Sequence, residues 1–157
     1  MYPDEYRNSE DDAAIYWFSS PFDALNNWSA HIVEVWRQKF MTLEHAYHFA
    51  KFEPQSHAAN EILNAKSPWE SKQLASKYKS EMVDNWHDVK VEVMEELFRH
   101  KVQQNKDVKE ILLKTGDRKI YENSPVDSFW GVGKDGNGEN IMGKIQMKVR
   151  DELLERA

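Results

Sequence analysis

A run near the C-terminus combines residue types that suit the binding of a planar ring and an anion. Residues 127–140 read DSFWGVGKDGNGEN and hold four of the six glycines of the chain. Glycine lets the backbone adopt positive φ and approach a ligand closely, and Trp130 adds a flat apolar surface beside Gly131 and Gly133. From Asn140 onward apolar residues recur at helical spacing, so we expect a helix whose first N–H groups favour phosphate.

A second candidate site lies on a helix predicted to begin at Thr42. At about 100° per residue, Glu44, His48 and Lys51 align in one stripe between two apolar arcs. A helix that is apolar on two sides is expected to be buried, so the stripe must be paired internally or face a cavity. The alternative is a solvated face on which Glu44 and Lys51 form an ordinary ion pair.

The histidines and the glycine pattern also bear on cofactors. His45 adjoins the aromatic arc, and both a packed imidazole and a functional one remain open. The six histidines never form the His-x-x-x-His pair with a third acidic ligand that indicates zinc, so we expect no metal. The glycines of residues 131–136 match the dinucleotide fingerprint, but they lie near the end of a helical chain and not after a first strand. We therefore exclude a Rossmann fold and expect no cofactor.

The elements that must position these residues are mostly helical. Aromatic and β-branched residues at 16–18 and 32–36, followed by Phe40, predict short strands and a hairpin whose turn lacks glycine. Ser67-Pro68-Trp69-Glu70 forms a capping box with proline at the first helical position. Apolar spacing predicts a long helix over 85–103, Gly116 is expected to end a shorter one, and residues 119–122 are typical of a strand.

Length and composition limit the architecture and the location. A chain of 157 residues fits one domain, so we expect a mobile acidic tail over residues 1–12 and a single helix-dominated α+β domain over 13–157, with a small N-terminal β-hairpin or sheet. The formal net charge of −6 argues against a general binder of nucleic-acid backbones. There is no cysteine, no apolar run of membrane-spanning length and no signal peptide, so we expect a cytoplasmic protein.

Four motifs occur in an order that resembles the NADAR family, also called YbiA-like. They are the glycine run 127–140 with Gly143, Met147 and Arg150 after it, the block TLEHAYHFAKF at 42–52 downstream of Asn27-Trp28, Ser67-Pro68, and Asn85-Trp86. The resemblance extends from about residue 16 to residue 154. It implies an N-glycosidase that hydrolyses the ribose C1–N bond of a phosphorylated riboside. In one branch of the family the substrate is a riboflavin-pathway intermediate, and in another it is ADP-ribosylated guanine in nucleic acid.

The resemblance also implies roles for individual residues. Breaking a C1–N bond requires a carboxylate or a nucleophile near C1, a held ring and an anchored phosphate. Glu44 and Asp127 are the candidate carboxylates, and Lys51 matches a family lysine able to form an imine with an opened ribose, which needs a lowered pKa. The residues expected to bind substrate are Asn27, His48, Trp86, Trp130, Gly131, Gly133 and Asn140.

One departure from the family leaves the substrate open. Many relatives carry a Gly-Arg pair where this chain has Ala75-Ser76, and an arginine there would clamp a phosphate. Lys72 or Lys77 can replace its charge but not its bidentate geometry, and their run with Lys79 is also typical of a solvated helix face. The alternatives to an enzyme are a module that binds NAD, ADP-ribose or a nucleotide without turnover, and a helical interaction protein.

Overall fold

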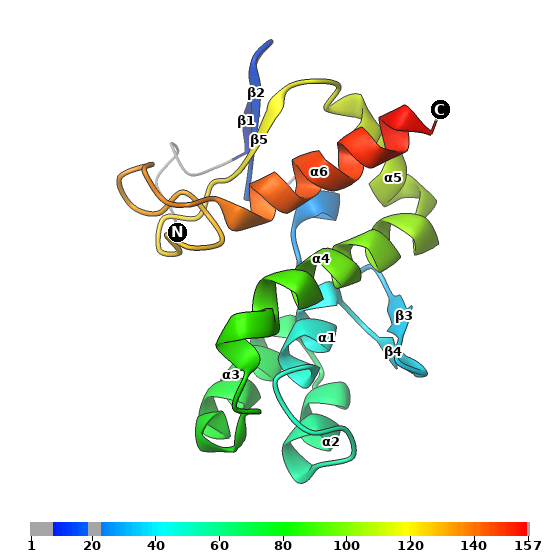
Figure 1. Ribbon diagram of the computed structural model, residues 1–157, viewed down its shortest axis with the longest axis vertical. Coiled ribbons are helices and arrows are strands. Elements are labelled where there is room, and N and C mark those ends of the chain that lie inside the picture. Colours follow the sequence, from blue (N-terminus) through cyan, green and yellow to red (C-terminus); the bar gives the residue numbers. More distant parts are fainter. Residues whose placement is uncertain (1–7, 19–22, 157) are drawn as a thin grey trace. The chain divides into compact units, whose positions relative to one another are not determined.

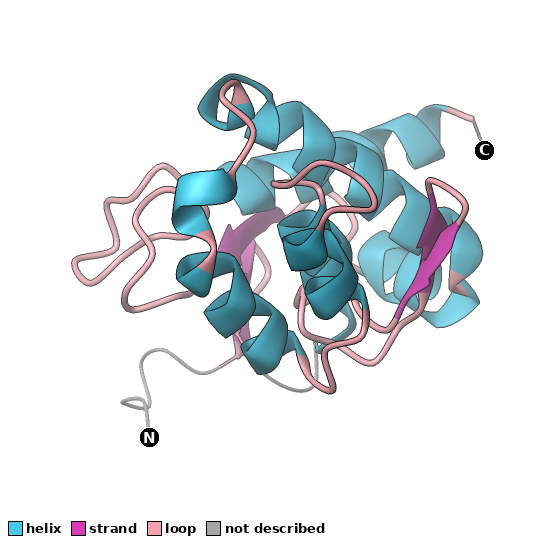
Figure 2. Cartoon of the chain, turned by 90° about the horizontal axis from the view of Figure 1, so that it is seen from below, coloured by secondary structure: helices cyan, strands magenta, loops and turns pink. Residues whose placement is uncertain are grey.

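The computed structural model describes residues 8–18 and 23–156. Helices make up most of the regular structure in those ranges, and the strands are short (Figure 2). This confirms the predicted α+β class. The chain divides into two compact units: unit 1 is formed by residues 1–26 and 106–157, and unit 2 by residues 27–105. The single domain expected over 13–157 stays a prediction.

Unit 1 contains a three-stranded sheet of order β1-β2-β5. β1 (Ser9–Glu10) pairs antiparallel with β2 (Ala14–Trp17), and β2 pairs parallel with β5 (Lys119–Glu122), with Ile15 opposite Ile120. α6 (Ile141–Glu155) packs along β5, and α5 (Lys106–Lys114) packs against α6 (Figure 1). The sheet and α6 enclose an apolar core of Ala14, Ile15, Trp17, Ile120, Met142, Ile145 and Val149.

The segment expected to be a tail contributes to this sheet. Ser9–Glu10 form β1, so the ordered sheet begins before the predicted boundary at residue 12, whereas residues 1–7 lie outside the described residues. Asp11 turns the chain between β1 and β2, because its Oδ1 accepts hydrogen bonds from the N–H groups of Ala13 (2.7 Å) and Ala14 (2.8 Å).

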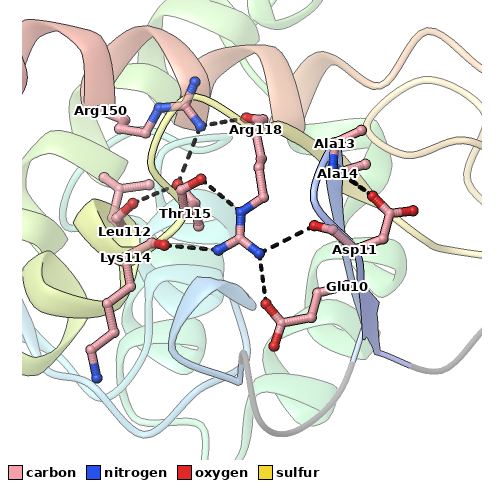
Figure 3. Close-up of polar contacts among 9 residues, drawn as sticks. All are labelled: Glu10, Asp11, Ala13, Ala14, Leu112, Lys114, Thr115, Arg118 and Arg150. Carbon is pink, nitrogen blue, oxygen red and sulfur yellow. Dashed lines mark hydrogen bonds and ion pairs between the residues drawn. The ribbon is translucent and has the colours of Figure 1, made fainter.

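Two arginines join the helices of unit 1 to its sheet (Figure 3). Arg118 donates to the carbonyl oxygens of Lys114 (2.8 Å) and Thr115 (3.0 Å) at the end of α5, and to Oε2 of Glu10 in β1 (2.7 Å). Arg150 of α6 is buried, and its Nη1 donates to Thr115 Oγ1 (3.2 Å) and to the Arg118 carbonyl oxygen. Hydrogen bonds to backbone carbonyls and a hydroxyl thus offset the cost of burying the Arg150 guanidinium.

Unit 2 surrounds a short central helix. α1 (Leu43–Phe49) packs against α2 (His57–Leu63), α3 (Pro68–Lys77) and α4 (Trp86–Gln104) (Figure 1). Its buried side chains include Leu43, Ala46, Tyr47 and Phe49, which confirms that the helix is apolar on two sides. Two 3₁₀ turns complete the described elements: η2 (Asp23–Leu25) in unit 1 and η3 (Lys79–Glu81) in unit 2.

The expected hairpin is formed by β3 (Val33–Val35) and β4 (Gln38–Phe40), and Trp36, which was predicted to end a strand, lies in its turn. Trp36 (φ 53°) and Arg37 (φ 62°) are the two turn residues, and both adopt positive φ, as a tight two-residue hairpin requires. Glycine or asparagine usually occupies such positions. Here stacking of Trp36 on Phe49 (6.3 Å between ring centroids, 18°) helps to hold the turn.

The predicted helix ends are confirmed with two small adjustments. Ser67 caps α3 by accepting from the Glu70 N–H (3.0 Å), and Pro68 is the first helical residue. Glu70 reaches back to the N–H of Lys66 (2.7 Å), which lies one residue before the cap. α4 begins at Trp86 and α5 ends before Gly116, which adopts φ +66°. The helix predicted over 85–103 therefore shifts by one residue at each end.

Candidate functional site

The stripe predicted on α1 brings a carboxylate and an imidazole together inside unit 2. Thr42 caps the helix by accepting from the His45 N–H (3.2 Å), and the Glu44 N–H donates to the Asn27 carbonyl oxygen (3.1 Å). Glu44 and His48 are separated by one helical turn, and His48 Nε2 therefore lies 3.3 Å from Glu44 Oε1. The two side chains are only 13% and 6% exposed. The stripe is therefore not a solvated face.

Lys51 lies just beyond the end of α1, which is a correction to its predicted place on the helix. α1 ends at Phe49, and the Lys51 N–H donates to the His48 carbonyl oxygen (3.2 Å) in the following turn. Lys51 Nζ lies over the Tyr47 ring, 5.1 Å from its centroid, and 6.0 Å from the centroid of Trp86. The Lys51 carbonyl oxygen accepts from the Val83 N–H (2.8 Å), which fixes this turn against the segment that leads into α4.

Three aromatic side chains border these charged groups. Tyr47 and Trp86 meet edge to face, with ring centroids 5.2 Å apart, and Trp86 is buried. Trp28 donates a hydrogen bond from Nε1 to Glu44 Oε2. The sequence did not lead us to expect either the Tyr47 ring or the Trp28 side chain at this site. Both residues could have been identified from their positions in the sequence. Tyr47 precedes the predicted site residue Lys51 by four residues, and Trp28 directly follows the predicted site residue Asn27.

Burial and neighbouring charges shift the pKa values of all three polar groups. Burial is the main cause that lowers the pKa of Lys51 to about 8; Glu44 opposes the shift, and Lys72 and Lys90 add to it. Burial alone would raise the pKa of Glu44, but His48, Trp28 and the Lys51 charge together lower it below its usual value. Burial also lowers the pKa of His48, against the influence of Glu44.

Near neutral pH the site therefore holds an ionised Glu44, a neutral His48 and a Lys51 with an appreciable fraction of free amine. A free amine is a nucleophile towards carbonyl carbon, and an adjacent carboxylate stabilises positive charge that develops nearby. Partial burial beside the rings of Tyr47 and Trp86 lowers the Lys51 pKa and so increases the fraction of free amine.

Two buried polar residues lie near this cluster in unit 2. His45 is fully buried, with Nδ1 2.8 Å from Thr42 Oγ1 and Nε2 3.0 Å from the Ala65 carbonyl oxygen, so both ring nitrogens have partners. The structure thus favours the packed imidazole. Asn27, expected to bind substrate, is buried, and its Nδ2 lies 3.7 Å from Met94 Sδ. Its backbone carbonyl oxygen accepts from the Glu44 N–H in the first turn of α1, and binding of substrate by Asn27 stays a prediction.

The other predicted residues belong to unit 1. Asp127 stabilises the start of the glycine run, since its Oδ1 accepts from the N–H groups of Phe129 (3.0 Å) and Trp130 (2.8 Å). Trp130 is half-buried and meets Phe129 edge to face at 5.0 Å. One oxygen of the Asp127 carboxylate is therefore engaged with the backbone, and the Trp130 ring is held beside a second aromatic ring.

Asn140 joins the glycine run to β5. Its Oδ1 accepts from the Glu122 N–H (2.9 Å) and its Nδ2 donates to the Ile120 carbonyl oxygen (2.9 Å). Asn140 itself adopts the left-handed conformation (φ 52°, ψ 43°), and α6 begins directly after it. The oxygen and the nitrogen of the Asn140 side-chain amide thus both form hydrogen bonds to the backbone of β5. The sequence pattern instead predicts that Asn140 contacts the substrate.

The glycines of the run also meet protein backbone at close range. A Cβ added to Gly131 would lie 2.7 Å from Glu122 Oε2 and 2.8 Å from the Glu122 carbonyl oxygen, and one on Gly143 would overlap the Ile120 carbonyl oxygen. Gly133 adopts φ +73°. Close approach to β5 is therefore a structural reason for Gly131 and Gly143, whereas close approach to a ligand was predicted for the glycine run. Binding of substrate by Gly131 and Gly133 stays a prediction.

The predicted site residues thus form two sets. Glu44, His48, Lys51, Asn27 and Trp86 lie together in unit 2, whereas Asp127, Trp130, Gly131, Gly133 and Asn140 lie in unit 1. Within residues 8–18 and 23–156, no group of three or more histidine or acidic side chains could hold a metal ion. In the same ranges no helix has the length and hydropathy to cross a membrane.

Known proteins resemble the chain over nearly its whole length. The NADAR domain family matches residues 7–154. N-glycosidase Npun_R5314 of Nostoc punctiforme is 36% identical over 143 residues, which cover 88% of this chain and 92% of that protein. The riboflavin biosynthesis protein VVA0006 of Vibrio vulnificus is 39% identical over 114 residues, covering 73% of this chain and 31% of that protein.

A solved structure agrees with these matches. The NMR structure of Escherichia coli YbiA has a TM-score of 0.83 to this chain at 27% identity, covering 94% of this chain and 89% of that one. YbiA of the same organism is also named an N-glycosidase. These names confirm the predicted enzyme class, a hydrolase acting on N-glycosyl bonds. By its sequence and its fold, the chain belongs to the NADAR domain family.

Proposed function

We propose that this protein hydrolyses the ribose C1–N bond of a phosphorylated riboside, with the unit 2 cluster at its centre. The observation that carries the proposal is the Lys51 amine, whose pKa is lowered to about 8 beside the Glu44 carboxylate and the rings of Tyr47 and Trp86. A module that only binds a nucleotide has no need for a neutral amine beside a carboxylate. The geometry therefore favours turnover over binding alone.

The proposed reaction gives Lys51 the role of nucleophile. Its neutral amine attacks C1 of the ring-opened ribosyl group, the new N–C1 bond replaces the bond to the base, and the base leaves with a proton. Water then adds to C1 of the imine, which releases the sugar aldehyde and restores the amine. The sum of both steps is hydrolysis, with no oxidant or cofactor required.

Glu44 and His48 complete the proposed centre. An ionised Glu44 stabilises the positive charge of the protonated imine and of the carbon that precedes it. His48 lies 3.3 Å from Glu44 and, being neutral, helps to orient the carboxylate and the substrate. Trp86 supplies an apolar wall beside Lys51. Within unit 1, Asp127 is proposed as a further catalytic carboxylate, and Trp130 and the glycine run as substrate-binding residues.

Two substrates meet these requirements. One is a phosphorylated ribosylaminopyrimidine of riboflavin synthesis, which is supported by the names of the Vibrio vulnificus relative and of the chloroplastic riboflavin biosynthesis protein PYRR of Zea mays. The other is ADP-ribosylated guanine in an oligonucleotide. A cytoplasmic location is part of the same proposal, supported by the absence of cysteine.

The test measures release of free base from both substrates by wild type, Lys51→Ala and the control Lys77→Ala. Lys77 is exposed at the last turn of α3, with its Nζ over the Tyr78 ring. We expect turnover of one substrate by wild type and Lys77→Ala, and none by Lys51→Ala. A protein that binds both compounds but releases no base would instead be a binding module. Full turnover by Lys51→Ala would remove Lys51 from the mechanism.

A further inference from the structure

Of the three aromatic residues that border the unit 2 cluster, Trp28 is the most accessible from outside. It is 39% exposed, whereas Tyr47 is 7% and Trp86 2% exposed. The Tyr47 ring lies beneath Lys51 Nζ and meets the Trp86 ring edge to face. Tyr47 and Trp86 therefore offer a ligand little ring surface, and Trp28 offers more.

Two contacts hold Trp28 to the carboxylate residue of the cluster. Its Nε1 donates to Glu44 Oε2, and the carbonyl oxygen of the preceding residue, Asn27, accepts from the Glu44 N–H (3.1 Å). The indole is thus fixed through its side chain and through the adjoining backbone before any ligand binds. A ring that is fixed in advance loses less conformational entropy when a ligand binds to it.

The same contacts order the cluster from the surface inwards. The exposed fraction falls from Trp28 to the Glu44 side chain (13%) and then to the His48 side chain (6%). Glu44 Oε2 accepts from Trp28, while Glu44 Oε1 lies 3.3 Å from His48 Nε2. A group that approaches Glu44 along this line of contacts therefore meets the indole first.

Exposure alone does not identify a binding surface, since single exposed aromatic side chains are common on proteins. Trp69 of α3 is more exposed still, at 58%. Trp28 differs because its polar edge is bound to the carboxylate that the proposed reaction uses. In the proposed substrate the base is joined directly to C1 of the ribose. A C1 held beside Glu44 therefore places the base close to the indole.

We propose that the exposed indole of Trp28 is the surface on which the base of the riboside stacks. This inference rests on the proposed function, which places C1 of the ribosyl group beside Glu44. Guanine and an aminopyrimidine both present a flat π-face, so stacking on an indole accepts either of the two proposed leaving bases. Trp28 is thus a substrate-binding residue in addition to a hydrogen-bond donor to Glu44.

The experiment measures binding of guanosine 5′-monophosphate, cytidine 5′-monophosphate and ribose 5-phosphate by titration calorimetry. The affinity for each nucleotide relative to ribose 5-phosphate isolates the contribution of the base. Trp28→Phe keeps a ring and removes the indole donor, whereas Trp28→Gln keeps a donor and removes the ring. The matched control is Trp69→Gln.

We expect wild type, Trp28→Phe and Trp69→Gln to prefer both nucleotides over ribose 5-phosphate. Trp28→Gln should bind the nucleotides about tenfold more weakly than wild type, as the loss of one stacked base implies. Its affinity for ribose 5-phosphate should stay unchanged, which also shows that the variant is folded.

Three results would overturn the inference. They are a preference for nucleotides that Trp28→Gln retains, equal binding of nucleotides and ribose 5-phosphate by wild type, and loss of the preference in Trp28→Phe as well as in Trp28→Gln. The last result would assign the effect to the hydrogen bond with Glu44 and not to the ring.

Binding is measured without turnover, so this inference and the proposed function fail separately. Binding of the base that depends on the Trp28 ring, without release of base from either substrate, would keep the stacking surface and reject the glycosidase. Release of base with the same KM in wild type and Trp28→Gln would keep the glycosidase and reject the stacking surface.

Discussion

The sequence predicts functional residues both in the glycine run of unit 1 and in the α1 cluster of unit 2. In the structure, the polar side chains of these two regions have different kinds of partner. In the glycine run, Asp127 and Asn140 bind backbone N–H and carbonyl groups. In the cluster, Glu44 and His48 lie 3.3 Å apart, and Lys51 Nζ lies over the Tyr47 ring. Polar groups that backbone partners satisfy hold the fold, whereas titratable groups with shifted pKa values remain available for chemistry.

One cation from each unit repeats this contrast. Arg150 is 4% exposed and donates to a hydroxyl and a backbone carbonyl, so its charge is satisfied by fixed hydrogen bonds. Lys51 lies over the faces of two rings, and its amine pKa is lowered to about 8. The contrast predicts that changes in the cluster alter rate more than stability, and that changes around the glycine run do the opposite.

The largest effect is expected for Lys51→Met. Loss of the amine should lower kcat/KM about 1,000-fold, equivalent to about 4 kcal/mol of transition-state stabilisation. Stability should not fall, because methionine fills similar volume without a buried charge. Steady-state kinetics and thermal unfolding measure the two quantities. A variant that unfolds readily would show that Lys51 supports the fold, which would break the contrast.

Gly143→Ala should cost about 3 kcal/mol of unfolding free energy, since the added methyl overlaps the Ile120 carbonyl oxygen and the Asn140 side chain. Gly116→Ala is a weaker control, because a Cβ there meets no atom within 4 Å and only the positive φ opposes it. Chemical denaturation gives both values. Gly143→Ala with wild-type stability would mean that α6 shifts on β5 without strain.

Asn140→Ala removes two hydrogen bonds to β5 and should lower the unfolding free energy by about 2 kcal/mol. Asn137→Ala, at an exposed position of the same run, should change it by less than about 0.5 kcal/mol. This pair separates the observed structural role of Asn140 from its predicted contact with substrate. A raised KM at unchanged stability would support the substrate contact.

The pH dependence of kcat/KM should follow the Lys51 amine. The reactive form is neutral, so the rate rises about tenfold per pH unit below the Lys51 pKa of about 8 and levels off above it. Glu44 stays ionised over this range, because its pKa is lowered. Lys72→Gln removes a neighbouring positive charge, so the Lys51 pKa should increase and the profile should move to higher pH. A profile that is flat from pH 6 to 9 would exclude the neutral amine as the reactive group.

Trp28→Phe should give the smallest effect. It removes the donor to Glu44 Oε2 and keeps an aromatic ring, so the pKa of Glu44 should rise and kcat/KM should fall about fivefold. Trp69→Phe provides the control, because Trp69 is 58% exposed on α3. If both variants had wild-type rates, the Trp28 hydrogen bond would not be needed for the reaction.

Local signals in the sequence predicted the elements well. The Ser67 cap, the strand at 119–122 and the helix after Asn140 each depend on a few neighbouring residues, and all three are present. The parallel pairing of β2 with β5 was not predicted, because it depends on which distant strand lies alongside. The contact of the glycine run with β5 was not predicted either. No local sequence pattern shows whether closely approaching glycines face a ligand or a neighbouring strand.

The candidate site was partly predictable for the same reason. The spacing of Glu44 and His48 along a helix fixed their proximity. The sequence pattern predicted Lys51 on that helix, but Lys51 lies in the turn that follows it. This turn brings the Lys51 amine over the Tyr47 ring. Lys72 and Lys90 come from two other helices, and only tertiary packing brings their charges to bear on Lys51.

The pairing of β2 with β5 has a consequence for the order in which the chain folds. Ala14 pairs with Lys119, about a hundred residues later, whereas unit 2 is continuous in the sequence from residue 27 to residue 105. During synthesis, unit 2 can complete its contacts while the partner strand of β2 is still missing. Prior folding of unit 2 then shortens the effective loop that must close, which lowers the entropic cost of forming the sheet in unit 1.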